Sequence, residues 1–161
     1  MAALDETPKA PRPLSIVFWA LVAVFAALVL TVLLPDVLPF FRPVFLSLMA
    51  LCFLLGLALL ILSVRWKQRT LLRMFWILAG ASTAGAALGS VLHNAFYALA
   101  TATGKWPILS AAMEALEVAT FAIATLLCPV AFLVGTVGAI VLLIRSARGR
   151  RSRDRGLAQR Q

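Results

Sequence analysis

Four long apolar segments constrain this chain more than any other feature of its sequence. Residues 14–34 and 44–64 each provide 21 residues without a charged side chain, and residues 74–97 and 118–144 are two further apolar segments. About 20 apolar residues in a helix cross a bilayer, because a helix rises about 1.5 Å per residue through a hydrocarbon core about 30 Å thick. The sequence therefore predicts an all-α integral membrane protein with four transmembrane helices.

The composition supports this prediction and excludes a soluble catalytic domain. Of the 161 residues, 63% are hydrophobic and 13% are charged, and the mean hydropathy is +1.00, whereas soluble proteins carry about 25% charged residues. The polar segments are too short to bury a core of their own. We therefore expect three parts: a polar leader at residues 1–13, a transmembrane domain at residues 14–144, and a basic tail at residues 145–161 that is disordered unless a partner or lipid holds it.

The positions of the basic residues predict the topology. All 15 Lys and Arg except Arg42 and Lys105 lie in the leader, in the loop at residues 65–73 or in the tail, which share one side of a four-span chain. Because short loops rich in Lys and Arg stay in the cytoplasm, we predict a cell-membrane protein with both termini cytoplasmic. The tryptophans fall near the expected interfaces: Trp19, Trp66 and Trp76 on the cytoplasmic side and Trp106 on the outer side.

The first span is expected to remain in the mature protein. Its 21 apolar residues exceed the apolar part of a signal peptide, and the acidic Asp5 and Glu6 precede it where a signal peptide is basic. The first two spans are plain Leu, Val and Ala segments, whereas the third and fourth carry most of the Gly and polar residues of the spans. Short connections make consecutive helices neighbours, so we expect an antiparallel four-helix bundle.

The third span contains a pattern of small residues. Gly85 and Gly89 form GxxxG, and steps of four extend this stripe to His93 and Tyr97. Small residues at this spacing let two helix backbones approach closely. Two alternatives remain open: the stripe packs against another helix of the same chain, or it forms a seam in a homo-oligomer.

A candidate polar cluster lies at the outer ends of the third and fourth spans. His93 is the only histidine, and it stands about 28 Å along the helix from Met74, near the outer edge of the hydrocarbon core. The connection predicted at residues 98–117 carries two glutamates close to the fourth span, with Ser110 as the expected helix N-cap. Antiparallel spans would bring these ends together. The candidate residues are His93, Asn94, Tyr97, Glu114 and Glu117.

This cluster has two interpretations. The first is structural: His93 and Tyr97 suit lipid head groups, and carboxylates near a helix start are favoured by the helix dipole. In the second, Glu117 pairs with His93, because an unpaired carboxylate beside hydrocarbon is costly. Such a pair could exchange a proton, bind an ion weakly or hold a polar ligand. The sequence carries no metal-binding or haem motif, so neither a metal nor a cofactor is predicted.

Three other features complete the predictions. Cys52 and Cys128 stand singly in apolar segments, as small buried hydrophobic residues do. Pro129 removes a helical hydrogen bond near mid-depth, which predicts a kink. The arginine-rich tail predicts attraction to anionic lipid at the cytoplasmic face, and its lack of interleaved aromatic residues argues against nucleic acid as a partner.

These observations favour a non-enzymatic protein, because no nucleophile and base stand in a recognisable arrangement. The favoured hypothesis is a small accessory, assembly or scaffold subunit that packs with partner membrane proteins or with copies of itself. The alternative is a small transporter, or a ligand-binding or ion-binding membrane protein, that uses the outer cluster. The spans contain no charged residue at mid-depth, which weighs against a proton-driven antiporter.

Overall fold

The computed structural model describes residues 11–34, 41–67 and 71–158, and almost all of these residues are helical. The elements are α1 (Arg12–Leu33), α2 (Phe41–Arg65), α3 (Leu71–Ala102), α4 (Pro107–Ala122), the π-helical turn η2 (Ile123–Leu127) and α5 (Cys128–Ala158). Within the described residues, four helical segments are long and apolar enough to span a membrane: 12–33, 43–65, 71–102 and 107–148. The chain is therefore an all-helical protein with four candidate membrane spans.

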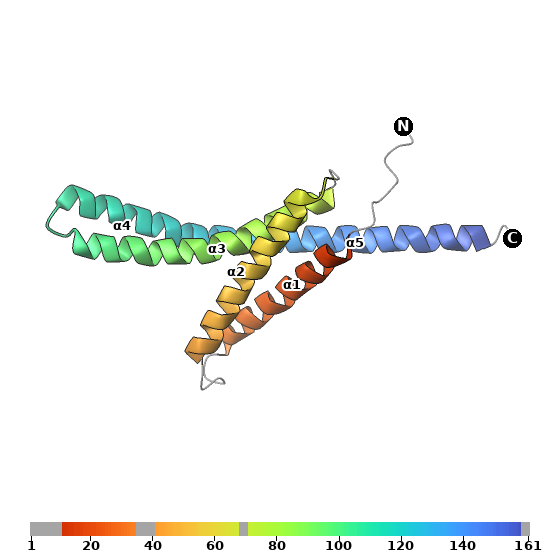
Figure 1. Ribbon diagram of the computed structural model, residues 1–161, viewed down its shortest axis with the longest axis horizontal. Helices are drawn as coiled ribbons and strands as arrows, with labels where there is room; N and C mark the ends of the chain where they lie inside the picture. Colours follow the sequence, from red (N-terminus) through yellow and green to blue (C-terminus); the bar gives the residue numbers. More distant parts are fainter. Residues whose placement is uncertain (1–10, 35–40, 68–70, 159–161) are drawn as a thin grey trace.

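The helices form two pairs that cross obliquely (Figure 1). We call α1 and α2 the short pair, and α3 with the continuous α4–η2–α5 helix the long pair. Helix α3 is central, because it contacts α2, α4 and α5. The long pair extends well beyond the short pair at the turn between α3 and α4 (Figure 1).

The buried core lies where the two pairs cross. Its largest fully buried side chains come from three helices: Phe18 and Leu21 of α1, Leu59 of α2 and Trp76 of α3. The Trp76 ring lies 6.1 Å from the Phe18 ring and 5.7 Å from the Trp66 ring, measured between centroids. Trp76, which the sequence predicted to lie near the cytoplasmic interface, is therefore also part of the buried core.

Glycines set the closest helix contacts at this crossing. A Cβ atom on Gly80 would lie 2.7 Å from the backbone oxygen of Gly56 in α2, and a Cβ on Gly135 of α5 would lie 2.8 Å from the backbone nitrogen of Ala79. Only a hydrogen in place of a side chain permits this approach. Helix α3 is thus clamped between α2 and α5 by glycines that lie outside the predicted GxxxG pair.

Only residues 103–106 separate α3 from α4, so most of the segment expected to connect the third and fourth spans, residues 98–117, is helical. The alanine-rich segments on both sides of this turn have high helix propensity. Helix α4 begins at Pro107, whose fixed φ suits the first helical position, and the N-cap is Trp106 and not Ser110. As a result, α3 has 32 residues and is about 48 Å long.

The basic tail also departs from the prediction, since α5 continues as a helix to Ala158 and is not disordered up to that residue. Arginine is a good helix former, and a helix that already exists extends more easily than a new one forms. Other predicted features lie outside the described residues: residues 1–10 of the leader, 35–40 of the first connection, 68–70 of the basic loop and 159–161 of the tail.

Candidate functional site

His93 of α3 and Glu117 of α4 face each other in the long pair. The His93 Nδ1 atom lies 3.8 Å from a carboxylate oxygen of Glu117 and 3.4 Å from the Glu117 backbone oxygen. Their side chains are 29% and 21% exposed, respectively. The imidazole ring also lies 5.2 Å from the Phe121 ring, one turn further along α4. The two residues therefore form a half-exposed polar pair with an aromatic neighbour.

Small residues hold α3 and α4 in the register that creates this pair. One turn before His93, a Cβ on Gly89 would lie 2.9 Å from the Ala124 Cβ, so these helices touch closely there. Beyond the pair, the Ser110 hydroxyl donates a hydrogen bond to the Ala100 backbone oxygen at 3.4 Å. These contacts occupy the face of Gly89 within the chain.

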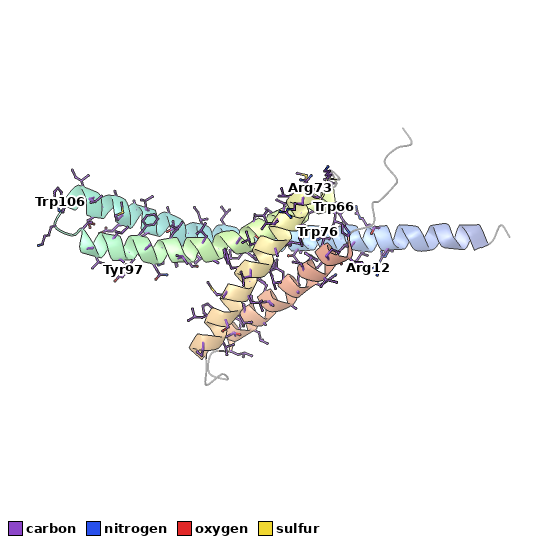
Figure 2. All side chains as sticks on the ribbon, in the orientation of Figure 1. Arg12, Trp66, Arg73, Trp76, Tyr97 and Trp106 are labelled. Atoms are coloured by element: carbon purple, nitrogen blue, oxygen red, sulfur yellow. The ribbon has the colours of Figure 1, made fainter. Side chains whose placement is uncertain are left out.

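The other three candidate residues do not join the pair. Asn94 donates to the backbone oxygen of Ser90 in its own helix at 2.7 Å. Glu114 is exposed and accepts a hydrogen bond from Ser110 at 3.4 Å. Tyr97 is 61% exposed and points away from α4 (Figure 2). The five-residue cluster therefore reduces to His93 and Glu117, because Asn94 and Glu114 bond within their own helices and Tyr97 is exposed.

The pair has hydrogen-bonding capacity to spare. A nitrogen–oxygen distance of 3.8 Å is an ion-pair distance and exceeds that of a hydrogen bond. Among the described residues, no donor bonds to the Glu117 carboxylate. The same part of the chain contains no group of three His, Cys, Asp or Glu residues placed to hold a metal ion. The arrangement is suited to holding a proton or a polar group between an imidazole and a carboxylate.

A cavity of about 490 Å³ lies between the short and long pairs. The cavity wall is mostly apolar. It is formed by apolar residues of α1 and α2, small residues of α3, and residues of the π-helical turn and the start of α5. They are Phe25, Leu28, Val29, Val32, Leu33, Phe45, Met49, Cys52, Thr83, Ala86, Ala87, Ser90, Ala124, Thr125 and Pro129. Sequence reasoning missed this cavity, because it arises from the oblique crossing of the pairs.

The π-helical turn ends at Leu127, two residues before Pro129, where the sequence predicted a kink. The Cys128 backbone N–H donates to the backbone oxygen of Ile123, five residues earlier. Proline has no N–H to continue the usual ladder, and single π-helical turns in helices often mark functional sites. This turn places Ala124 and Thr125 in the cavity wall.

Arg73 is a further residue whose role the sequence did not reveal. Its guanidinium donates to the backbone oxygens of Ser63 at 2.9 Å and Val64 at 3.1 Å, at the end of α2. Carbonyls at a helix end lack partners within the helix, and a cation there is also favoured by the helix dipole. Arg73, in the first turn of α3, thus stabilises the end of α2. The basic residues between the second and third apolar segments were the available signal.

Comparison with protein families finds no model that matches this chain, and comparisons with characterised proteins and with solved structures find no significant match.

Proposed function

We propose that this chain is a non-enzymatic accessory, assembly or scaffold subunit of the cell membrane, with antiparallel spans and both termini in the cytoplasm. The positive-inside distribution of Lys and Arg supports this orientation. Arg12, Trp66 and Arg73 lie near one another at one end of the short pair, and Trp106 lies at the far end of the long pair (Figure 2). These residues fit a cytoplasmic and an outer interface, respectively.

The exposed outer end of the long pair is the observation that carries this proposal. Helix α4 buries none of its residues, and at its start Trp106 is 71% and Ile108 is 89% exposed. Helix α3, which runs beside α4, is about 48 Å long. Even at an average tilt of about 20° it is longer than the hydrocarbon core of about 30 Å is thick. Apolar residues that extend past the core gain by contact with another protein. We therefore assign the partner contact to the start of α4.

Site-specific photo-crosslinking tests this assignment. A crosslinker at Ile108 is expected to capture one defined membrane protein, whereas a crosslinker at Ile16, which is exposed on α1, captures lipid. Without the crosslinker, the paired substitutions Ile108→Ser and Leu109→Ser are expected to abolish co-purification of the captured partner without changing thermal stability, because both side chains are exposed. Identical capture from Ile108 and Ile16 would contradict the proposal.

A second candidate function is supported by the His93–Glu117 pair, whose closest side-chain atoms lie 3.8 Å apart. In this function the pair handles a proton, an ion or a polar ligand at the outer face, as in a small transporter or binding protein. The expected signature is a change of melting temperature with pH or cation concentration that disappears in both His93→Ala and Glu117→Gln. A signal that persists in both variants would assign it to other groups.

The basic end of α5 supports a proposed contact with anionic lipid at the cytoplasmic face. The seven tail arginines begin at Arg145, and each basic residue near an anionic surface contributes about 1 kcal/mol. Binding of a peptide of residues 145–161 to anionic vesicles is expected to weaken steeply as salt increases. Binding that salt does not change would instead indicate a specific partner.

If the chain forms homo-oligomers, we propose that the contact uses a face other than that of Gly89, because Ala124 covers Gly89 within the chain.

A further inference from the structure

The cavity and the polar pair lie on the same helix faces. On α3, the lining residues Thr83, Ala86 and Ser90 follow helical spacing, and His93 is the next residue in this series. On the opposite helix, Glu117 and Phe121 precede the lining residue Thr125 in steps of four. The pair therefore stands at the outer end of the cavity, about one turn beyond its wall on α3.

The two parts of this site differ in what they can bind. The cavity volume of about 490 Å³ falls in the range of small-molecule sites. Its hydroxyl groups are already satisfied, because Thr83, Ser90 and Thr125 donate to backbone oxygens of their own helices at 3.0, 2.9 and 2.7 Å. The cavity therefore favours a hydrocarbon chain.

The polar pair favours a head group with two complementary charges. The Glu117 carboxylate can accept from an ammonium, and the His93 imidazole can donate to a phosphate oxygen. A phosphate without an amine would instead place two negative charges side by side. A choline head group carries the positive charge but no N–H donor. An amino head group thus fits both residues.

We infer that the cavity and the His93–Glu117 pair together bind one amino-phospholipid, with one acyl chain in the cavity. The ammonium lies against Glu117 and the phosphate against His93. This inference rests on the second proposed function and specifies its ligand. The bilayer supplies the ligand directly, because the cavity lies between candidate membrane spans.

Lipid retention in purified protein tests the inference. Native mass spectrometry of the full chain in mild detergent is expected to show one bound phospholipid. Added phosphatidylethanolamine is expected to raise the melting temperature more than phosphatidylcholine or phosphatidylglycerol does. Ala86→Leu fills the cavity and is expected to abolish retention, whereas Ala119→Leu, on an exposed part of α4 outside the cavity wall, retains the lipid. Glu117→Gln is expected to keep a bound lipid but to lose the preference for the amino head group.

Several results would overturn the inference. These are equal retention in Ala86→Leu and Ala119→Leu, equal stabilisation by the three lipids, or a partner helix crosslinked to the cavity wall. If Ala86→Leu fails to fold, Val29→Phe narrows the cavity from an exposed position on α1 and must reduce retention. A pH-dependent or cation-dependent stability signal without a lipid preference would retain the second proposed function and reject its ligand. If neither a lipid preference nor a pH-dependent or cation-dependent stability change is found, both the lipid inference and the second proposed function are rejected.

Discussion

The two ends of the crossing between the helix pairs differ in how they are packed. At the closed end, Trp76 is fully buried among Phe18 and Leu59, and α3 approaches its neighbours through Gly80. At the open end, the same helices separate and leave a cavity of about 490 Å³ beside the half-exposed His93–Glu117 pair. Close packing at one end thus accompanies an open cavity at the other end.

Removal of the largest buried side chain, at the closed end, is expected to lower the stability of the protein more than any other change considered below. Trp76→Ala leaves a void at the closed end and should lower the free energy of unfolding by about 3–5 kcal/mol. The matched control Trp106→Ala removes an exposed indole and should change it by less than about 0.5 kcal/mol. Chemical unfolding in detergent measures both. Equal losses would show that the closed end does not dominate stability.

Addition of one methyl group at the helix crossing should have the next largest effect. Gly80→Ala places a Cβ atom 2.7 Å from the Gly56 backbone oxygen and 2.9 Å from the Leu60 backbone nitrogen. Helices must move apart to accept it, at an expected cost of about 1–3 kcal/mol. In Gly104→Ala the nearest atom, the Thr101 backbone oxygen, is 3.6 Å away, and no loss is expected. Thermal unfolding of the two variants compares them directly, and a stable Gly80→Ala protein would disprove the close contact.

Loss of the guanidinium at the end of α2 should have a smaller effect. Arg73→Met removes hydrogen bonds to the backbone oxygens of Ser63 and Val64. The expected cost is about 1–2 kcal/mol, since hydrogen bonds to charged groups contribute more than neutral ones but solvent screens this half-buried site. Lys67→Met, an exposed substitution with the same loss of charge, is the control. If both variants have the same melting temperature, the loss of stability comes from the lost charge and not from the hydrogen bonds of Arg73 to the end of α2.

The smallest expected effect belongs to the open end. A double-mutant cycle of His93→Ala and Glu117→Gln should give a coupling energy of about 0.5 kcal/mol, because the pair is in contact but partly exposed. Unfolding of the wild type, both single variants and the double variant provides this value. Strictly additive losses of stability would mean that His93 and Glu117 do not interact. The two residues would then not form the single head-group site that the lipid inference requires.

The four candidate spans could be predicted from the sequence, because such spans are recognised by the length and hydropathy of each segment. It also placed His93 and Glu117 on facing helices, since sequential helices with a short turn are neighbours. It did not reveal the oblique crossing, which depends on where Gly56, Gly80 and Gly135 meet in space. The cavity follows from that crossing and was missed with it. The turn between α3 and α4 is shorter than the expected connection, because the alanine-rich segments on both sides of it have high helix propensity, which extends α3 to Ala102 and starts α4 at Pro107 instead of after Ser110.

Distances between spin labels at the two ends test the central claim most directly. After replacement of the buried Cys52 and Cys128, labels are placed at exposed positions: Ile16 with Met74 for the closed end, and Leu33 with Val91 for the open end. Figure 1 shows the start of α1 beside the long pair and the other end of α1 away from it, and near that start the Phe18 ring lies 6.1 Å from the Trp76 ring of α3. Double electron–electron resonance in lipid nanodiscs should therefore give a longer distance for the open-end labels than for the closed-end labels. Equal distances would indicate a parallel-sided bundle without a fork and would contradict the account.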